Sequence, residues 1–182
     1  MSSTWTRSSP ACSGSRPTRK RGFPPVVAAD TRLLVLGSLP GEASLAAGRY
    51  YAHPQNAFWR LMGEVIGEDI AALPYDGRLA ALLRHRVGLW DVVGEATRPG
   101  SLDTAIRDAT HNDLAALVAT LPALRMAAFN GGKAARDGRR LLAAHEDRLR
   151  LLTLPSSSPA HASLRFAEKA AVWHELRAVL AD

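Results

Sequence analysis

Residues 33–41 read LLVLGSLPG, an apolar run that stops at a glycine and passes into a proline–glycine turn. A short, continuous apolar run bounded by turn residues is typical of a strand buried on both faces. Three further runs share this character, over residues 87–93 (VGLWDVV), 126–129 and 149–154. The sequence therefore predicts four buried strands.

Apolar residues recur at helical spacing between these runs. The pattern predicts helices over residues 56–66, 76–86, 113–120, 133–145 and 165–180. Short strands that alternate with helices favour a parallel sheet covered on both faces. We therefore expect an α/β protein with three α/β/α layers and a central four-stranded parallel sheet.

The positive charge of the chain is concentrated at its N-terminus. Residues 1–22 contain five basic and no acidic residues, are rich in Ser, Pro and Gly, and show no periodicity, which predicts a disordered basic tail before a single domain over residues 23–182. That domain carries 18 basic and 17 acidic residues. The tail is open to three interpretations: a source of nonspecific phosphate affinity, an extension without a role, or the product of a misassigned start codon.

Several functional classes are disfavoured by composition. The single cysteine, Cys12, allows no disulfide framework, and the six histidines show no ligand-like spacing, so we expect no metal and no cofactor. No apolar run reaches the roughly 18 residues that a membrane-spanning helix needs. We expect a monomer that does not bind membranes and that is located in the cytoplasm.

Small or polar residues follow all four predicted strands, at Gly37-Ser38, Trp90-Asp91, Asn130-Gly131 and Pro155-Ser156. In open α/β sheets the ligand crevice lies beyond the carboxyl ends of the strands. These four ends are therefore expected to converge on one pocket of small-molecule size.

Two clusters after these strands carry chemistry. In the first, GSLPGEASLAAGRYYAHPQNAFW (37–59), aromatic rings surround the amide of Asn56, which suits a planar heterocycle that is stacked on one face and hydrogen-bonded at its edge. In the second, LPSSSPAHA (154–162), hydroxyls and free N–H groups suit phosphate binding, and residues 159–161 suit a wedge between bases. Structural interpretations remain open: Phe58 and Trp59 as core residues, and the serine loop as a helix cap.

Together the two clusters resemble the hypoxanthine-DNA glycosylase (DNA-deoxyinosine glycosylase) family of the uracil-DNA glycosylase superfamily. GLWDVV (88–93) and AFNG (128–131) resemble intermediate strand ends of the same family, and the likeness covers about residues 23–180. The mismatch-specific uracil-DNA glycosylases are a more distant likeness. The resemblance implies a fold with the predicted parallel sheet, and a metal-free, monofunctional enzyme of base-excision repair.

The resemblance also implies roles for individual residues. Asn56 takes the position of the catalytic amide, and Tyr51 that of the stacking aromatic ring. The other implied substrate-binding residues are Gly37, Ser38, Leu39, Pro40, Gly41, Phe58 and Asn130, with Asn130 reading the base edge. The implied DNA-binding residues are Ser156, Ser157, Ser158, Pro159 and His161.

This chain departs from the superfamily pattern at two positions in the first cluster. Leu39 stands where most members have an Asp or Asn that handles the water, as expected for the deoxyinosine family and not for an efficient uracil enzyme. Gln55 stands where a basic residue often precedes the asparagine, which weakens a phosphate contact.

The resemblance implies double- or single-stranded DNA with deaminated bases, chiefly hypoxanthine, as the substrate, and therefore a location on the nucleoid when the enzyme acts. Such an enzyme extrudes the nucleotide and hydrolyses its N-glycosidic bond, and hydrogen bonds to the departing purine stabilise its negative charge. Two alternatives remain: a mismatch-specific uracil-DNA glycosylase, and a catalytically weak module that binds damaged DNA.

Overall fold

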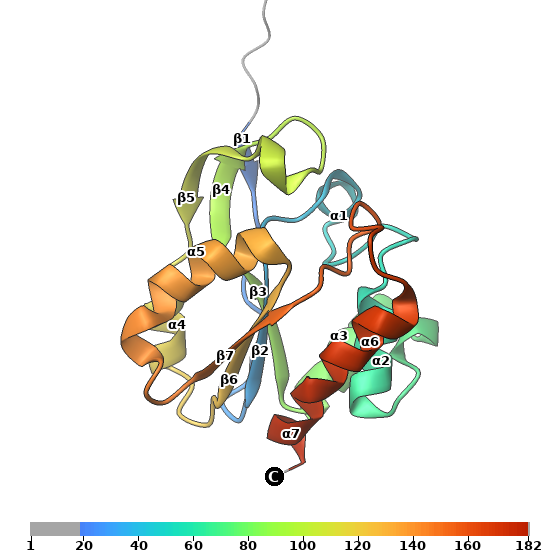
Figure 1. Ribbon diagram of the computed structural model, residues 1–182, viewed down its shortest axis with the longest axis vertical. Helices are drawn as coiled ribbons and strands as arrows, with labels where there is room; N and C mark the ends of the chain where they lie inside the picture. Colours follow the sequence, from blue (N-terminus) through green and yellow to red (C-terminus); the bar gives the residue numbers. More distant parts are fainter. Residues whose placement is uncertain (1–18, 182) are drawn as a thin grey trace, which may run out of the picture.

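A computed structural model describes residues 19–181 of the protein (Figure 1). Its centre is a four-stranded sheet in the order β3-β2-β6-β7, and every neighbouring pair is parallel. The strands are β2 (Leu33–Gly37), β3 (Val87–Asp91), β6 (Met126–Asn130) and β7 (Arg150–Leu154). All four lie at the predicted places in the sequence, so the expected parallel sheet is confirmed.

Helices cover both faces of this sheet (Figure 1). One face packs against α2 (Phe58–Ile66), α3 (Tyr75–Arg84) and α6 (Phe166–Trp173), and the other against α4 (Leu114–Ala119) and α5 (Gly132–Leu142). Side chains of β2 alternate accordingly, with Leu33 and Val35 in the first core and Leu34 and Leu36 in the second. Three α/β/α layers are therefore confirmed.

The remaining helical segments are short. They are α1 (Glu42–Ala47), α7 (Arg177–Leu180) and the 3₁₀ turns η1 (Ile70–Ala72), η2 (Asp103–Ala105), η3 (Ala143–His145) and η4 (His174–Leu176). The predicted helix over residues 165–180 is thus divided into α6, η4 and α7, and α1 was not predicted. Within residues 19–181, no helix is long and apolar enough to span a bilayer.

A second, antiparallel sheet was missed by the sequence patterns. It has the order β1-β4-β5 and consists of β1 (Arg19–Arg21), β4 (Val93–Thr97) and β5 (Arg107–His111). The predicted strand over residues 87–93 therefore ends at Asp91, and the chain continues as β4. His111 at the end of β5 approaches α5, where its Nε2 lies 3.4 Å from Oδ2 of Asp137.

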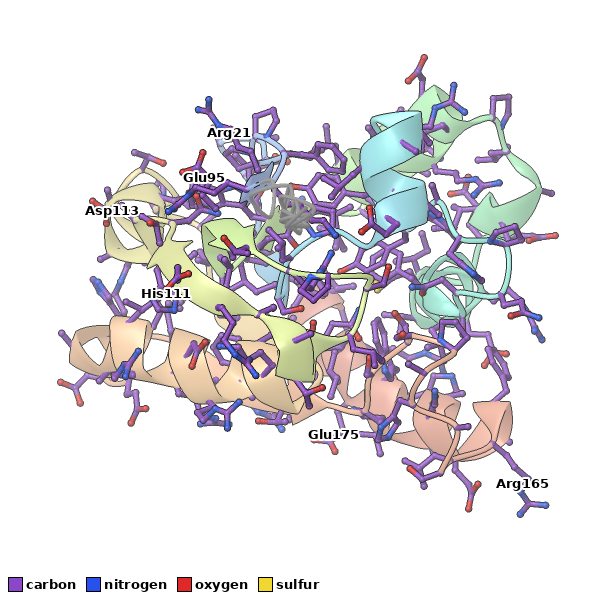
Figure 2. All side chains as sticks on the ribbon, turned by 90° about the horizontal axis from the view of Figure 1, so that it is seen from above. Arg21, Glu95, His111, Asp113, Arg165 and Glu175 are labelled. Carbon is purple, nitrogen blue, oxygen red and sulfur yellow. The ribbon has the colours of Figure 1, made fainter. Side chains whose placement is uncertain are left out.

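The boundary of the predicted basic tail is also different. Residues 19–21 pair with β4, and Arg21 lies opposite Glu95 in the register, on one side of the molecule (Figure 2). An ordered strand thus begins inside the segment that we expected to be disordered, and the rest of the predicted tail, residues 1–18, lies outside the described residues.

Close packing between α5 and the sheet depends on a glycine. A Cβ added at Gly138 would lie 2.2 Å from Cε1 of Phe129, a fully buried ring on β6. Gly77 in α3 offers the matched case, since a Cβ there would come no closer than 3.5 Å to its neighbours.

Gly138→Ala is therefore expected to destabilise the protein by about 1–3 kcal/mol, because the ring cannot move within the core. Gly77→Ala is expected to be neutral or to stabilise by up to about 1 kcal/mol, because alanine favours helix. Urea denaturation of both variants measures the difference. Equal stabilities for the two variants would contradict this packing.

Candidate active site

The carboxyl ends of the four parallel strands converge on one cavity of about 560 Å³, as predicted. Thirteen of the fourteen predicted site residues line it, namely Gly37, Ser38, Leu39, Pro40, Gly41, Tyr51, Asn56, Asn130, Ser156, Ser157, Ser158, Pro159 and His161. The clusters at residues 37–59 and 154–162, far apart in the sequence, thus face the same space.

Phe58 is the predicted site residue that does not line the cavity. Its side chain is fully buried in the core and stacks beneath the ring of Tyr51, with the ring centroids 3.7 Å apart and the planes inclined by 11°. Phe58 therefore supports Tyr51 and does not contact the cavity, and the core interpretation was right for both Phe58 and Trp59.

The backbone of Tyr51 is in the left-handed region, with φ of 50°. Residues other than glycine rarely adopt this conformation, and doing so costs on the order of 1 kcal/mol or more. In Tyr51 this backbone conformation occurs together with a side chain whose ring is stacked on Phe58 on one face. Because Tyr51 lines the cavity, its other face is the one that a planar ligand can stack against.

The orientation of the Asn56 amide is fixed by the start of α2. Its Oδ1 accepts a hydrogen bond of 3.0 Å from the backbone N–H of Phe58, which explains why the helix begins two residues later than predicted. The oxygen is thus assigned to the helix end, and the NH₂ group is the donor that remains. In the cavity, Asn56 is primarily a hydrogen-bond donor.

Ser157 holds the serine loop against the rest of the site. The Asn130 amide donates to Oγ of Ser157 at 2.8 Å and accepts from its backbone N–H at 2.8 Å. The carbonyl of Ser157 accepts from the N–H of Ala57 at 3.0 Å. Asn130 therefore connects β6 to the loop, and its base-reading role stays a prediction.

The end of the serine loop is held by a buried lysine on α6. Lys169 is 6% exposed, and its Nζ donates to the carbonyl of His161 at 2.8 Å. Burial lowers the pKa of this ammonium group from its ordinary value.

A buried arginine holds the GSLPG turn. Arg98 is 2% exposed and donates to the backbone carbonyls of Leu39, at 3.1 Å, and of Pro40. The side chain of Leu39 packs into the small core of the second sheet. On the same wall, the hydroxyl of Ser38 donates to Oδ1 of Asp103 at 2.6 Å. The segment that connects β4 to β5 in the missed second sheet thus supplies one wall of the site.

Asp91 belongs to the site but was not among the predicted site residues. It ends β3, lines the cavity and is 4% exposed. Its Oδ2 is sealed from solvent and has no hydrogen-bond partner among the described residues. Its Oδ1 lies so close to Gly37 that a Cβ at that position would be 2.5 Å away. The signal in the sequence was its place at a strand end.

Burial raises the pKa of Asp91 to about 7, against the opposing effect of the Arg98 guanidinium, while the nearby Asp103 carboxylate raises it further. Desolvation disfavours the charged form of a carboxyl group. Burial also raises the pKa of the Tyr51 phenol, against the opposing effect of the nearby Asn130 amide. Its hydroxyl likewise meets no partner in hydrogen-bond geometry among the described residues. Both side chains are therefore uncharged at slightly acidic pH.

Within residues 19–181, no cluster of three or more His, Cys, Asp or Glu side chains could hold a metal ion. Lys133 is the lysine that lines the cavity, and its Nζ is paired with Oδ2 of Asp137 one helical turn later in α5.

Asp91 makes the stability of the protein depend on pH. Its pKa is near 7 in the folded state and near 3.8 when exposed, so the folded state binds the proton more tightly and the free energy of unfolding falls as pH rises from about 4 to 7. Asp91→Asn removes this loss. Relative to the parent protein, the variant is expected to gain on the order of 2–4 kcal/mol between pH 4.5 and pH 8.

Urea denaturation at pH 4.5, 6 and 8 measures this gain. Asp76→Asn, which changes an exposed carboxylate on α3, is the matched control and is expected to keep the parent's pH dependence. An unchanged pH dependence in Asp91→Asn would show that Asp91 ionises normally.

The chain is similar to known proteins over most of its length. The family model "Uracil DNA glycosylase superfamily" matches residues 24–177. Hypoxanthine DNA glycosylases from Methanosarcina barkeri and Methanosarcina acetivorans are 47% and 45% identical over 115 residues, covering 63% of this chain and 73% of each relative. The solution structure of a candidate uracil DNA glycosylase from Methanosarcina acetivorans superimposes with a TM-score of 0.81 at 38% identity, over 91% of this chain and 100% of that chain.

The family match, the shared fold and the cavity between the two sequence clusters agree with the resemblance of those clusters. The chain belongs to the uracil-DNA glycosylase superfamily.

Proposed function

We propose that this protein is a monofunctional DNA glycosylase that removes hypoxanthine from DNA containing deoxyinosine, and that it acts as a monomer. The observation that carries the proposal is the cavity in which the Tyr51 ring and the Asn56 amide face the serine loop. Two relatives at 45–47% identity are hypoxanthine DNA glycosylases, which supports the choice of base.

Entry of the base requires that the nucleotide leave the DNA duplex. Extrusion costs a few kcal/mol and is least costly for a mispaired base such as hypoxanthine opposite thymine. The Tyr51 ring, supported from behind by Phe58, offers a flat surface that recovers part of this cost by stacking. Pro159 and His161 lie at the cavity, where they can occupy the space that the base leaves.

The serine loop and the start of α5 suit contacts with the DNA backbone. The hydroxyls of Ser156 and Ser158 also fix the loop, since each accepts a hydrogen bond of 3.2 Å from a backbone N–H two residues later. Arg136 lines the cavity with an exposed side chain, and Lys133 lies beside it. Hydroxyls and cationic side chains are the usual partners of phosphate oxygens, and these contacts position the DNA without reading its sequence.

Asn56 acts by donating a hydrogen bond. Its oxygen accepts from the N–H of Phe58, the first residue of α2, so its NH₂ group is available for the departing purine or for the attacking water. Breakage of the N-glycosidic bond leaves negative charge on the purine, and a donor held in place stabilises that charge without reorganisation. An amide does not titrate near neutrality, which suits a dissociative reaction that needs little base strength.

Leu39 argues against uracil as the main substrate. Its side chain is 5% exposed and packs with Val93 and Ala96, and its carbonyl is bonded to Arg98. It therefore offers no polar side chain to a water molecule at the position where most of the superfamily has one.

Labelled oligonucleotides with one deoxyinosine, deoxyuridine or deoxyxanthosine, incubated with excess protein and then treated with alkali, test the proposal. We expect cleavage at deoxyinosine, and only after alkali, because Lys133 is paired and a monofunctional enzyme leaves the abasic strand intact. Main cleavage at deoxyuridine would favour the mismatch-specific uracil alternative. Binding without cleavage of any substrate would favour the weak damage-binding module.

Asn56→Ala is the matched variant for this assay, since it removes the amide donor. We expect its excision rate to fall by about 10²–10³-fold, a typical loss for one positioned donor. Its thermal unfolding serves as the folding control, with a loss of about 1 kcal/mol because the hydrogen bond to the N–H of Phe58 is lost. Excision near the parent rate would remove Asn56 from the mechanism.

A further inference from the structure

Asp91 is a buried titratable group of the cavity to which the proposed mechanism gives no role. It lies at the end of β3, on the cavity floor beside Gly37. Buried polar atoms are nearly always hydrogen-bonded, and one that lacks a partner needs an explanation. Oδ2 of Asp91 and the hydroxyl of Tyr51 are the two buried side-chain atoms without a partner among the described residues, and both side chains line the cavity.

The surroundings of Asp91 favour its uncharged acid form. The titratable groups coupled to it are Tyr50 and Tyr51 before α2, Arg98 after β4 and Asp103 in η2. Arg98 and Asp103 shift the pKa of Asp91, whereas the Asp91 carboxylate raises the pKa of the two tyrosines. Arg98 is the sole cation among these groups, and its guanidinium is bonded to the carbonyls of Leu39, Pro40 and Gly100. No group in this set is bonded to the Asp91 carboxyl, so burial outweighs attraction.

The two oxygens of Asp91 have different surroundings. A proton on the sealed Oδ2 would have no acceptor, so the proton is better placed on Oδ1, beside Gly37 at the cavity. An O–H group there can donate a hydrogen bond to a ligand in the cavity. The residue at position 37 must be glycine for this arrangement, since a Cβ would lie 2.5 Å from Oδ1 and 3.3 Å from the Tyr51 hydroxyl.

From this geometry we infer that Asp91, as an uncharged acid, donates a hydrogen bond from Oδ1 to the exocyclic oxygen of the everted base, and is thereby a specificity-determining residue. The inference rests on the proposed function. Hypoxanthine carries a carbonyl oxygen at C6 where adenine carries an amino group. A carboxylic acid held neutral by an apolar site is an established means of donating such a bond.

The same bond would assist departure of the base. As the N-glycosidic bond breaks, negative charge spreads over the purine and reaches the C6 oxygen, so a donor at that atom binds the transition state more tightly than the substrate. An ionised Asp91 would instead repel the departing anion. Excision should therefore require the protonated form, which is populated below about pH 7.

The test is the pH profile of the single-turnover excision rate on deoxyinosine DNA, from pH 5.5 to 9. For the parent protein we expect a rate that falls by at least tenfold above pH 7. Asp91→Asn keeps a donor of similar shape that does not titrate, so its rate at pH 6 should lie within about tenfold of the parent and remain flat to pH 9. Asp91→Ala should be at least tenfold slower than the parent at pH 6, and also flat.

Asp103→Asn provides a second, matched carboxylate variant. The Asp103 charge raises the pKa of Asp91, so its removal should move the fall in rate to lower pH without abolishing it. Other groups at the cavity, such as His53 and His161, remain in all of these variants. A fall in the excision rate caused by such groups would persist in Asp91→Asn.

The outcomes separate the two proposals. Excision of hypoxanthine with a pH profile that Asp91→Asn leaves unchanged, or with a rate that rises with pH and is lost in Asp91→Asn, overturns the role of Asp91 as an acid donor and leaves the proposed function intact. No excision from deoxyinosine at any pH overturns the proposed function and the Asp91 inference with it.

Discussion

Ser157 connects the parts of the protein that carry its chemistry. Its side chain and N–H are bonded to the Asn130 amide on β6, and its carbonyl accepts from Ala57, next to Asn56. These bonds hold the loop after β7 against the segment before α2, although about 100 residues separate them. Without them the serine loop and the Asn56 amide would face the cavity independently, and their spacing would not be fixed. Positioning at this precision is what catalysis by an untitratable amide depends on.

A second constraint is the cost of burying polar groups at the cavity floor. Asp91 and Tyr51 each have a polar atom without a partner among the described residues, and such atoms cost on the order of 1–3 kcal/mol each. Tyr51 in addition has a left-handed backbone. Strain and unpaired polar atoms gather at functional sites, because a ligand supplies the missing contacts. The stability that we expect Asp91 to lose as pH rises from about 4 to 7 is consistent with a floor shaped for a ligand and not for the empty protein.

The sequence predicted the central sheet because its four strands are apolar runs that periodicity detects, and the polar residues after them predicted the cavity. The second sheet escaped because β4 (VGEAT) and β5 (RDATH) lack a regular apolar alternation. The hydrogen bonds from Arg98 to the GSLPG turn were missed for the same reason, because Arg98 follows β4. Phe58 was assigned to the substrate because sequence spacing does not say which face of α2 meets Tyr51. Asp91 was visible as a strand end, but only the fold reveals that its carboxyl is buried.

The most direct measurement is a crystal structure of the protein with its products, a duplex containing an abasic site and free hypoxanthine. We expect the purine to stack on the Tyr51 ring, with its C6 oxygen within hydrogen-bond distance of Asp91 Oδ1 and the Asn56 NH₂ group in contact with the ring. The serine loop should contact the phosphates that flank the abasic site. A purine bound elsewhere, with the Tyr51 ring and the Asp91 carboxyl left uncovered, would contradict the assignment of this cavity as the base-binding site.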